Sequence, residues 1–209
     1  NPGNRNNEIG LPLTLLELDK THQYAVLEMG FYVPGDIRTL CEIAQPQIGV
    51  VTNIGTVHAE RAGTKEIIAK GKAELVESLP TGPKGIAILN VDDPWVIGMA
   101  DKTKAEIFTY GVESEADLKA VDILSSGLKG LSLNLVHQGE VHQAHSPLMG
   151  AFSAYTILRA TAVAINAGLD WELINTGIAA SQIDLRMRQF SLPNGAIILD
   201  DTYNAAPES

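Results

Sequence analysis

Three side chains that can bind a metal or react as a base or nucleophile occur at separate points in the first half of the chain. Glu28 ends the apolar run Tyr24-Ala-Val-Leu-Glu28. His58, with Glu60 two residues later, lies in a polar turn after a second apolar run, and Lys72 lies in a helical pattern that begins near Thr64. A carboxylate, an imidazole and an amine can bind an ion, move a proton or form a covalent adduct.

Lys72 lies on the apolar side of its predicted helix. At ~100° per residue it shares an arc with Ile68, Leu75 and Leu79, and the residues expected on the opposite side are Glu66, Lys70, Glu74 and Glu77. Burial favours a neutral amine, and a neutral amine that adds CO₂ becomes a carbamate, an anionic oxygen ligand of the kind Mg²⁺ prefers. The alternative is a packed stem whose ammonium reaches water, and periodicity alone favours this alternative.

The elements that would position these side chains alternate between strands and helices. After a turn-rich loop over residues 1–12, strands are expected over 24–28, 48–53, 85–90 and 105–110, and helices over 14–18, 36–44, from 64 onward and over 94–99. This alternation predicts an α/β fold, with a mostly parallel, doubly wound sheet and helices on both faces. Such sheets bind ligands at the carboxyl ends of their strands, which is where Glu28 falls.

The pattern changes near residue 113. Segments 120–124, 131–136 and 141–145 are rich in β-formers and separated by short turns, which predicts a small antiparallel meander. His137, His142 and His145 occur there, but no cysteine or carboxylate pair completes a metal-binding set. We expect surface histidines.

Two helices, over 150–168 and 171–180, precede a hairpin over 189–199 that leads into an acidic pair, Asp200-Asp201. We expect residues 1–185 to form one domain and residues 186–209 to begin a C-terminal Rossmann-like domain. The chain starts at Asn1 without a methionine, so we expect a piece of a longer protein.

Composition narrows the class of protein. A hydrophobic content of 45% with 19% charged residues is typical of a globular protein with a sizeable core. The net charge of -10 argues against a nucleic-acid or anionic membrane surface, and no apolar run is long enough to insert into a membrane. The single cysteine, Cys41, excludes an internal disulfide and favours a reducing compartment, hence the cytoplasm.

Taken together, these motifs resemble the central, ATP-binding domain of the Mur ligases. The resembling segments are Gly3-Asn-Arg-Asn-Asn-Glu-Ile-Gly-Leu-Pro12, Glu28-Met-Gly30, Thr52-Asn-Ile-Gly-Thr-Val-His58-Ala-Glu60, Ala69-Lys-Gly-Lys72, Asn90-Val-Asp-Asp93 and Asp200-Asp-Thr-Tyr-Asn-Ala205. They follow the family's order over nearly the whole chain, and the spacing from His58 to Lys72 also resembles the family's.

The resemblance implies an ATP-dependent ligase that forms an amide through an acyl phosphate. It implies that Glu28, His58 and a carbamylated Lys72 form the catalytic, Mg²⁺-binding set. It further implies nucleotide contacts from Asn6, Asn7, Arg186, Asp201, Tyr203 and Asn204. Within the family, the asparagine-rich loop and the Asp-Asp-Thr-Tyr-Asn ending favour the branch that joins D-alanyl-D-alanine to a UDP-N-acetylmuramoyl-tripeptide in peptidoglycan synthesis.

Some family features are missing. No glycine-rich phosphate-binding loop ending in Gly-Lys-Thr or Gly-Lys-Ser occurs in the 209 residues, and we expect it just before Asn1. Phe152, Ser153 and Thr156 stand where the family carries amides that contact adenine, and Leu185 stands where a glycine is expected. The piece alone is therefore expected to be inactive.

Two alternatives stay open. One is another Mur ligase or a folylpolyglutamate synthetase, which share the metal and lysine arrangement. The other is a ligase-like scaffold that binds a nucleotide without forming an amide. Ser153 and Thr156 favour the scaffold, whereas Glu28, His58 and Lys72 weigh against it.

Overall fold

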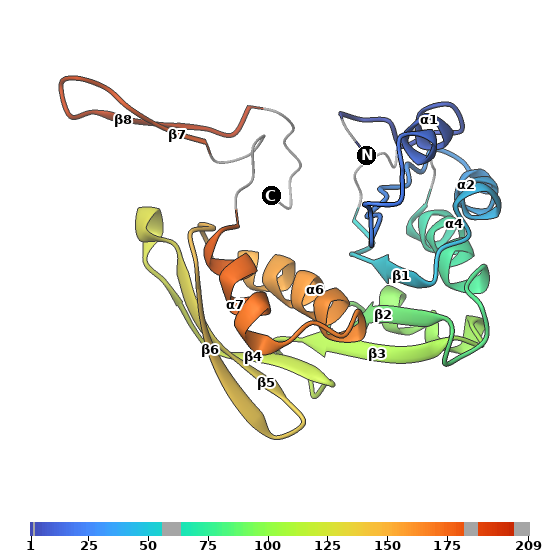
Figure 1. Cartoon of the computed structure of the whole chain (residues 1–209). Helices are drawn as coiled ribbons and strands as arrows, with labels where there is room; N and C mark the ends of the chain where they lie inside the picture. Colours follow the sequence, from blue (N-terminus) through green and yellow to red (C-terminus); the bar gives the residue numbers. More distant parts are fainter. Residues whose placement is uncertain (2, 56–63, 182–187, 203–209) are drawn as a thin grey trace. The chain divides into compact units, whose positions relative to one another are not determined.

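The computed structural model describes residues 1, 3–55, 64–181 and 188–202 (Figure 1). The chain folds into two compact units, Asn1–Thr109 and Tyr110–Ser209. Six strands are hydrogen-bonded in sequence order, from β1 to β6, and a separate two-stranded sheet is formed by β7 and β8.

The first unit contains an α/β arrangement. Its elements are α1 (Gly10–Leu16), α2 (Asp36–Ala44), β1 (Ile48–Val51), α4 (Lys65–Glu77), β2 (Ile86–Asn90), α5 (Pro94–Ile97), a 3₁₀ turn (Ala100–Lys102) and most of β3 (Glu106–Gly111), which ends in the second unit. β1 and β2 pair in parallel, with Val50 opposite Ile88. The crossover between them contains α4, as parallel pairing requires.

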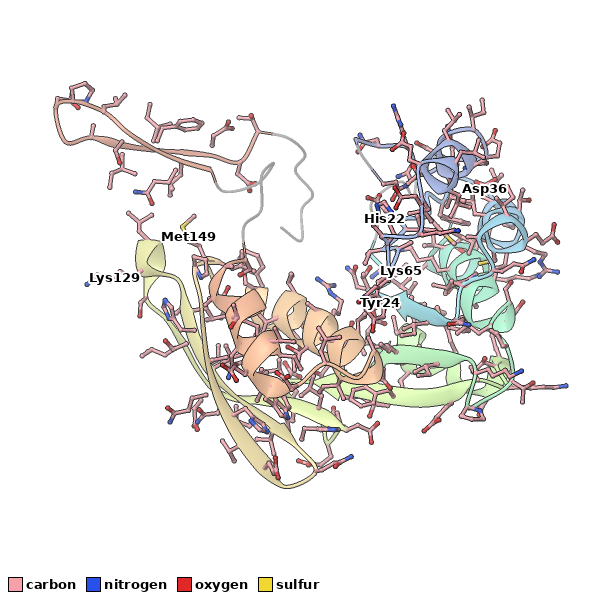
Figure 2. All side chains as sticks on the ribbon, viewed as in Figure 1. His22, Tyr24, Asp36, Lys65, Lys129 and Met149 are labelled. Atoms are coloured by element: carbon pink, nitrogen blue, oxygen red, sulfur yellow. The ribbon has the colours of Figure 1, made fainter. Side chains whose placement is uncertain are left out.

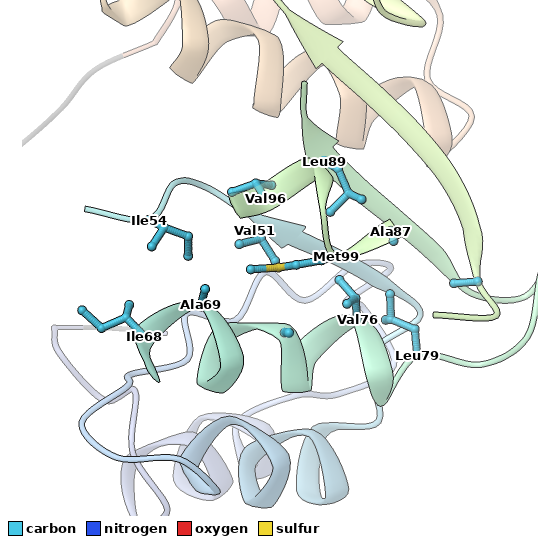
Figure 3. Packing of buried hydrophobic residues seen from close by; sticks show 12 residues of the cluster. Val51, Ile54, Ile68, Ala69, Val76, Leu79, Ala87, Leu89, Val96 and Met99 are labelled. Carbon is cyan, nitrogen blue, oxygen red and sulfur yellow. The ribbon is translucent and has the colours of Figure 1, made fainter. Parts of the chain in front are cut away.

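The core of the first unit lies between α4 and the strands (Figure 3). Ile68, Ala69 and Val76 of α4 meet Val51 and residues of β2 and α5 in one cluster. α2 packs on α4 as well. In β2, Leu89 belongs to this cluster and the adjacent Ile88 is also fully buried. A strand whose successive residues are both buried is covered on both faces, as is typical of parallel sheets.

The second unit contains the meander. β4 (Leu118–Ser125) pairs in parallel with the end of β3 and antiparallel with β5 (Leu131–His137), which pairs antiparallel with β6 (Glu140–Ser146). A 3₁₀ turn (Gly127–Lys129) follows β4. α6 (Ser153–Asn166) contacts β4 and β5, and α7 (Trp171–Ala179) contacts β6. The hairpin β7 (Arg188–Ser191) and β8 (Ile197–Asp200) completes the described chain.

The structure confirms the predicted α/β fold with parallel pairing and an antiparallel meander, and most predicted elements occur within a few residues of their expected bounds. One prediction, the strand at residues 24–28, is wrong. Residues 24–28 are neither helix nor strand (Figure 2 marks His22 and Tyr24 there), and the side chains of Tyr24 and Val26 are 61% and 83% exposed. The first helix is also displaced, since α1 begins at Gly10 rather than Thr14.

The physical reason for the missing strand is the set of hydrogen-bond partners of this segment. A strand needs a neighbouring strand to receive its backbone groups. Here the side-chain oxygen of Asn1 accepts the backbone N–H of Glu28 at 2.8 Å, and the Asn1 amide donates to the Glu28 carbonyl at 3.1 Å. At Glu28 the backbone groups therefore bond to an asparagine side chain rather than to a neighbouring strand.

No helix among the described residues is long and apolar enough to cross a bilayer.

Candidate active site

Lys72 lies at the centre of the candidate site. α4 starts after its N-cap Thr64 and carries Lys72 half-buried, with Nζ donating to the backbone carbonyl of Asn53 at 2.9 Å. Burial lowers the pKa of Lys72 below its ordinary value of 10.5, and the negative charge of Asp93 partly opposes this by raising it. Partial burial of Lys72, which both interpretations of the helical pattern expect, is confirmed, while its role as a metal ligand stays a prediction.

Asp93 fixes the turn that receives Lys72. One carboxylate oxygen accepts the backbone N–H of Ile54 at 2.9 Å. The other accepts the N–H groups of Trp95 at 2.9 Å and Val96 at 3.3 Å, which makes Asp93 the N-cap of α5. Both oxygens are therefore in use, and they join the loop after β2 to the turn after β1. Sequence reasoning had not assigned Asp93 a role of its own, although an aspartate just before Pro94 is a recognisable helix-start signal.

Glu28 and Asn6 come together from distant points in the sequence. The side-chain amide of Asn6 donates to Glu28 Oε1 at 2.9 Å, and the Asn6 carbonyl accepts the backbone N–H of Gly30 at 2.7 Å. The carboxylate is exposed. The expectation that Glu28 ends a strand is wrong, but the asparagine-rich loop does lie against it.

Asn7 has a local structural contact. Its Oδ1 accepts the backbone N–H groups of Ile9 at 3.2 Å and Gly10 at 2.8 Å, at the start of α1. Ser153 is similarly engaged, because its hydroxyl donates to the Met149 carbonyl at 2.7 Å. Thr156 accepts a hydrogen bond from Arg159 at 2.9 Å.

The face of α4 expected to be polar contains a buried carboxylate. Glu74 is 6% exposed, and its two oxygens accept the backbone N–H groups of Gly35 at 2.8 Å and Arg38 at 3.0 Å. The placement of Glu74 on the solvent side of α4 is therefore wrong. The reason is that α2 packs on that side and presents the unpaired N–H groups of its first turn, which attract a negative charge.

Several predicted residues fall outside the described ranges. They are His58, Glu60, Leu185, Arg186, Tyr203 and Asn204. Asp201 is described and exposed, and it belongs to the second unit. Of the three histidines in the meander, His142 is not a simple surface residue, since its ring stacks on Trp171 with centroids 3.6 Å apart and planes at 11°.

The donor chemistry of the first unit fits Mg²⁺ bound together with a nucleotide. Mg²⁺ is commonly held by one or two carboxylates plus substrate phosphates rather than by an all-protein cage. Glu28 presents such a carboxylate, and Lys72 would present an oxygen pair as a carbamate. No group of three His, Cys, Asp or Glu residues in the described ranges could hold a metal ion, and a nucleotide-assisted site does not need one.

Comparison with known proteins places this fold in a family. Residues 1–164 match the model of the Mur ligase middle domain. The chain therefore belongs to the Mur ligase middle domain family.

Two named relatives show which Mur ligases the chain is similar to. The chain is 37% identical over 207 residues to the UDP-N-acetylmuramoyl-tripeptide--D-alanyl-D-alanine ligase of Synechocystis sp., with 99% of this chain and 43% of the relative covered. It is 34% identical over 210 residues to the ligase of the same name from Mycobacterium bovis, with 100% and 41% covered. The chain thus spans less than half of these relatives.

Solved structures of Mur ligases also superpose on the chain. MurF from Acinetobacter baumannii superposes with a TM-score of 0.90 at 30% identity, covering 99% of this chain and 45% of that one. MurF from Thermotoga maritima, solved in complex with ADP, gives 0.85 at 28%, covering 99% and 47%. A folylpolyglutamate synthase from Thermotoga maritima gives 0.66 at 15%, covering 87% and 40%, and so shares the fold alone.

Proposed function

We propose that the protein containing this chain is an ATP-dependent ligase that joins D-alanyl-D-alanine to a UDP-N-acetylmuramoyl-tripeptide in peptidoglycan synthesis, in the cytoplasm. The observation that carries the proposal is the pairing of a desolvated Lys72 with the strand-end turn at Asn53, inside a fold that superposes on MurF over 99% of the chain. The named relatives support the substrate assignment.

The reaction has two chemical steps. An oxygen of the tripeptide carboxylate attacks the γ-phosphorus of ATP, which forms an acyl phosphate and releases ADP. The amine of D-alanyl-D-alanine then attacks the acyl carbon, the carbon–oxygen bond to phosphate breaks, and the amine loses a proton. Two polyanions must approach each other in the first step, so their repulsion must be offset.

In this proposal Glu28, His58 and carbamylated Lys72 hold Mg²⁺, which would supply positive charge at the phosphates. Asn6 orients Glu28, a contact supported by the 2.9 Å bond between them. The proposed nucleotide contacts remain Asn6, Asn7, Arg186, Asp201, Tyr203 and Asn204.

We also keep the proposed division into residues 1–185 and a further domain from 186. In support of the latter, β8 exposes Ile197, Ile198 and Leu199 on both its faces, as a strand of a larger, doubly covered sheet would.

The proposal is tested by an amide-ligation assay of the full-length protein with ATP, Mg²⁺ and a UDP-muramoyl-tripeptide. Phosphate release and the ligated product are measured with D-alanyl-D-alanine, with single amino acids and with glutamate as the amine. We expect release that depends on D-alanyl-D-alanine. Glutamate-dependent turnover with a folate in place of the tripeptide would favour a folylpolyglutamate-type ligase, and nucleotide binding without any product would favour a scaffold.

A further inference from the structure

The segment that carries Glu28 is joined to α4 by a close contact between Phe31 and Gly71. Phe31 follows Glu28 by three residues, and Gly71 directly precedes Lys72. A Cβ built on Gly71 would lie 2.5 Å from Phe31 Cζ and 3.0 Å from Cδ2, and closer still to Cε2. The ring therefore rests on the bare backbone of the helix, an approach that only glycine permits.

Glycine at position 71 lowers the stability of the helix, and the close approach of the Phe31 ring explains why it is there. Gly71 lies in the interior of α4, where glycine is less favourable than alanine. The Phe31 side chain is half-buried and packs against the hydrophobic cluster that includes Ile68 and Ala69 of the same helix. The ring fills the position that a side chain at residue 71 would occupy.

Three contacts fix the segment from Glu28 to Arg38, and the contact between Phe31 and Gly71 is one of them. On one side, Asn6 binds the Glu28 carboxylate and the backbone of Gly30. On the other, Glu74 of α4 accepts the N–H groups of Gly35 and Arg38, at 2.8 and 3.0 Å. Phe31 lies between these two anchors in the sequence, and its contact on α4 is beside Lys72. Its size therefore affects how closely the Glu28 segment approaches the Lys72 helix.

We propose that Phe31, seated on Gly71, is a positioning residue that sets the separation of Glu28 from Lys72 and so the affinity of the site for a Mg²⁺–nucleotide complex. This inference rests on the proposed function. Phe31 touches neither ion nor substrate in it, and acts through the backbone of residues 28–31 and through α4.

The test uses the full-length protein and Mg²⁺-dependent ADP binding, measured by calorimetry. Phe31→Leu removes the Cε and Cζ atoms that lie over Gly71. We expect the half-saturating Mg²⁺ concentration to rise on the order of tenfold, as when a support of a metal ligand is lost. Val76→Ala is the control, because it removes buried packing from the same cluster five residues after Gly71 in the sequence, and it should lower the melting temperature while leaving the Mg²⁺ dependence unchanged.

A double substitution tests the contact itself. Gly71→Ala should lower the melting temperature and weaken Mg²⁺-dependent binding in the wild-type background. In the Phe31→Leu background the same change should raise the melting temperature, because the two ring atoms nearest the added Cβ are gone and alanine favours the helix. Equal effects of Gly71→Ala in both backgrounds, or unchanged Mg²⁺ dependence in Phe31→Leu, would overturn the inference.

The outcomes separate this inference from the proposed function. Wild-type protein that ligates D-alanyl-D-alanine while Phe31→Leu keeps normal Mg²⁺ dependence overturns the positioning role alone. Wild-type protein that binds Mg²⁺–ADP but forms no amide overturns the ligase proposal, while the Phe31→Leu comparison still decides the positioning role. Absence of Mg²⁺-dependent ADP binding overturns both.

Discussion

The ammonium group of Lys72 and the backbone carbonyl of Asn53 are joined by a 2.9 Å hydrogen bond that links α4 to the turn after β1. Asp93 holds the next residue of the same turn through the N–H of Ile54. The Asn53 carbonyl thus holds the amine at the carboxyl end of a parallel strand, where sheets of this type bind ligands, and Asp93 fixes the turn that contains this carbonyl.

Replacing Lys72 should remove activity. In the full-length protein, we expect Lys72→Ala to reduce the rate of ligation on the order of a hundredfold or more, since a ligand and its charge are lost at the phosphates. Added bicarbonate should not restore the rate, whereas small carboxylic acids should do so in part by supplying oxygen ligands. Lys70→Ala, on the exposed side of the same helix, is the control, and wild-type turnover in Lys72→Ala would contradict the carbamate.

The reactivity of Lys72 should rise at a lower pH than that of an ordinary lysine side chain, whose pKa is 10.5. Because burial lowers the pKa of Lys72, a larger fraction is neutral at any pH below 10.5, and acylation in CO₂-free buffer should reach its half-maximal rate at a lower pH. Asp93→Asn removes a charge that raises this pKa, so the midpoint should move lower again. Mass spectrometry of labelled wild type and Asp93→Asn measures both Lys72 midpoints, and a wild-type midpoint at or above 10.5 would contradict the burial.

The same lowered pKa has a consequence for stability. The folded state resists protonation of Lys72 more than the unfolded state does, so the unfolded state binds more protons between the lowered pKa and 10.5. Lys72 therefore destabilises the fold at neutral pH, and this cost decreases as pH rises through that window. Thermal unfolding of wild type and Lys72→Met at pH 7.5 and 9.5 should show the wild type gaining stability relative to the variant.

Glu74 should contribute more to the stability of α2 than its exposed neighbour Glu77 does. Glu74→Ala leaves the N–H groups of Gly35 and Arg38 without their acceptor, which should reduce the local opening free energy of α2 by about 1–3 kcal/mol. Glu77 pairs with Arg38 at 3.3 Å on the surface, so Glu77→Ala should cost less than about 1 kcal/mol. Hydrogen exchange of peptides covering Asp36–Ala44 measures both. Equal exchange rates in the two variants would contradict the role of Glu74 as the acceptor for the first turn of α2.

The charge of Glu28 can be separated from its hydrogen bond. Glu28→Gln keeps a carbonyl oxygen for the Asn6 amide but removes the negative charge, so Mg²⁺-dependent ATP binding should weaken about tenfold or more while the fold is kept. Glu17→Gln is the matched control, since Glu17 is an exposed carboxylate paired with Arg5 at 2.8 Å. Mg²⁺-dependent binding that survives alanine at both Glu28 and His58 would exclude them from the metal site.

Much of the fold was predictable because each of its helices and strands has a sequence pattern that lies within one continuous segment. α2 and α4 are bounded by turn and cap residues, and the meander is bounded by short glycine turns, so local preference and tertiary structure agree there. The burial of Lys72 was predictable for the same reason, because one helix contains the whole apolar arc.

Features that depend on two distant segments were not predictable. Whether residues 24–28 form a strand depends on the backbone partners available to that segment, and Asn1 binds both backbone groups of Glu28. Glu74 looks like a solvent-facing residue until α2 is packed beside it, and Gly71 looks like a weak point in a helix until Phe31 is placed over it. Asp93 is recognisable as a helix cap, but its bond to Ile54 links residues 39 positions apart.

The central claim, amide formation through an acyl phosphate, is tested most directly with a UDP-muramoyl-tripeptide whose reacting carboxylate contains ¹⁸O in both oxygens. One labelled oxygen should appear in the phosphate released by the full-length protein and the other in the new amide, with ADP as the second product. Release of AMP and pyrophosphate, or of phosphate without the label, would contradict the claim.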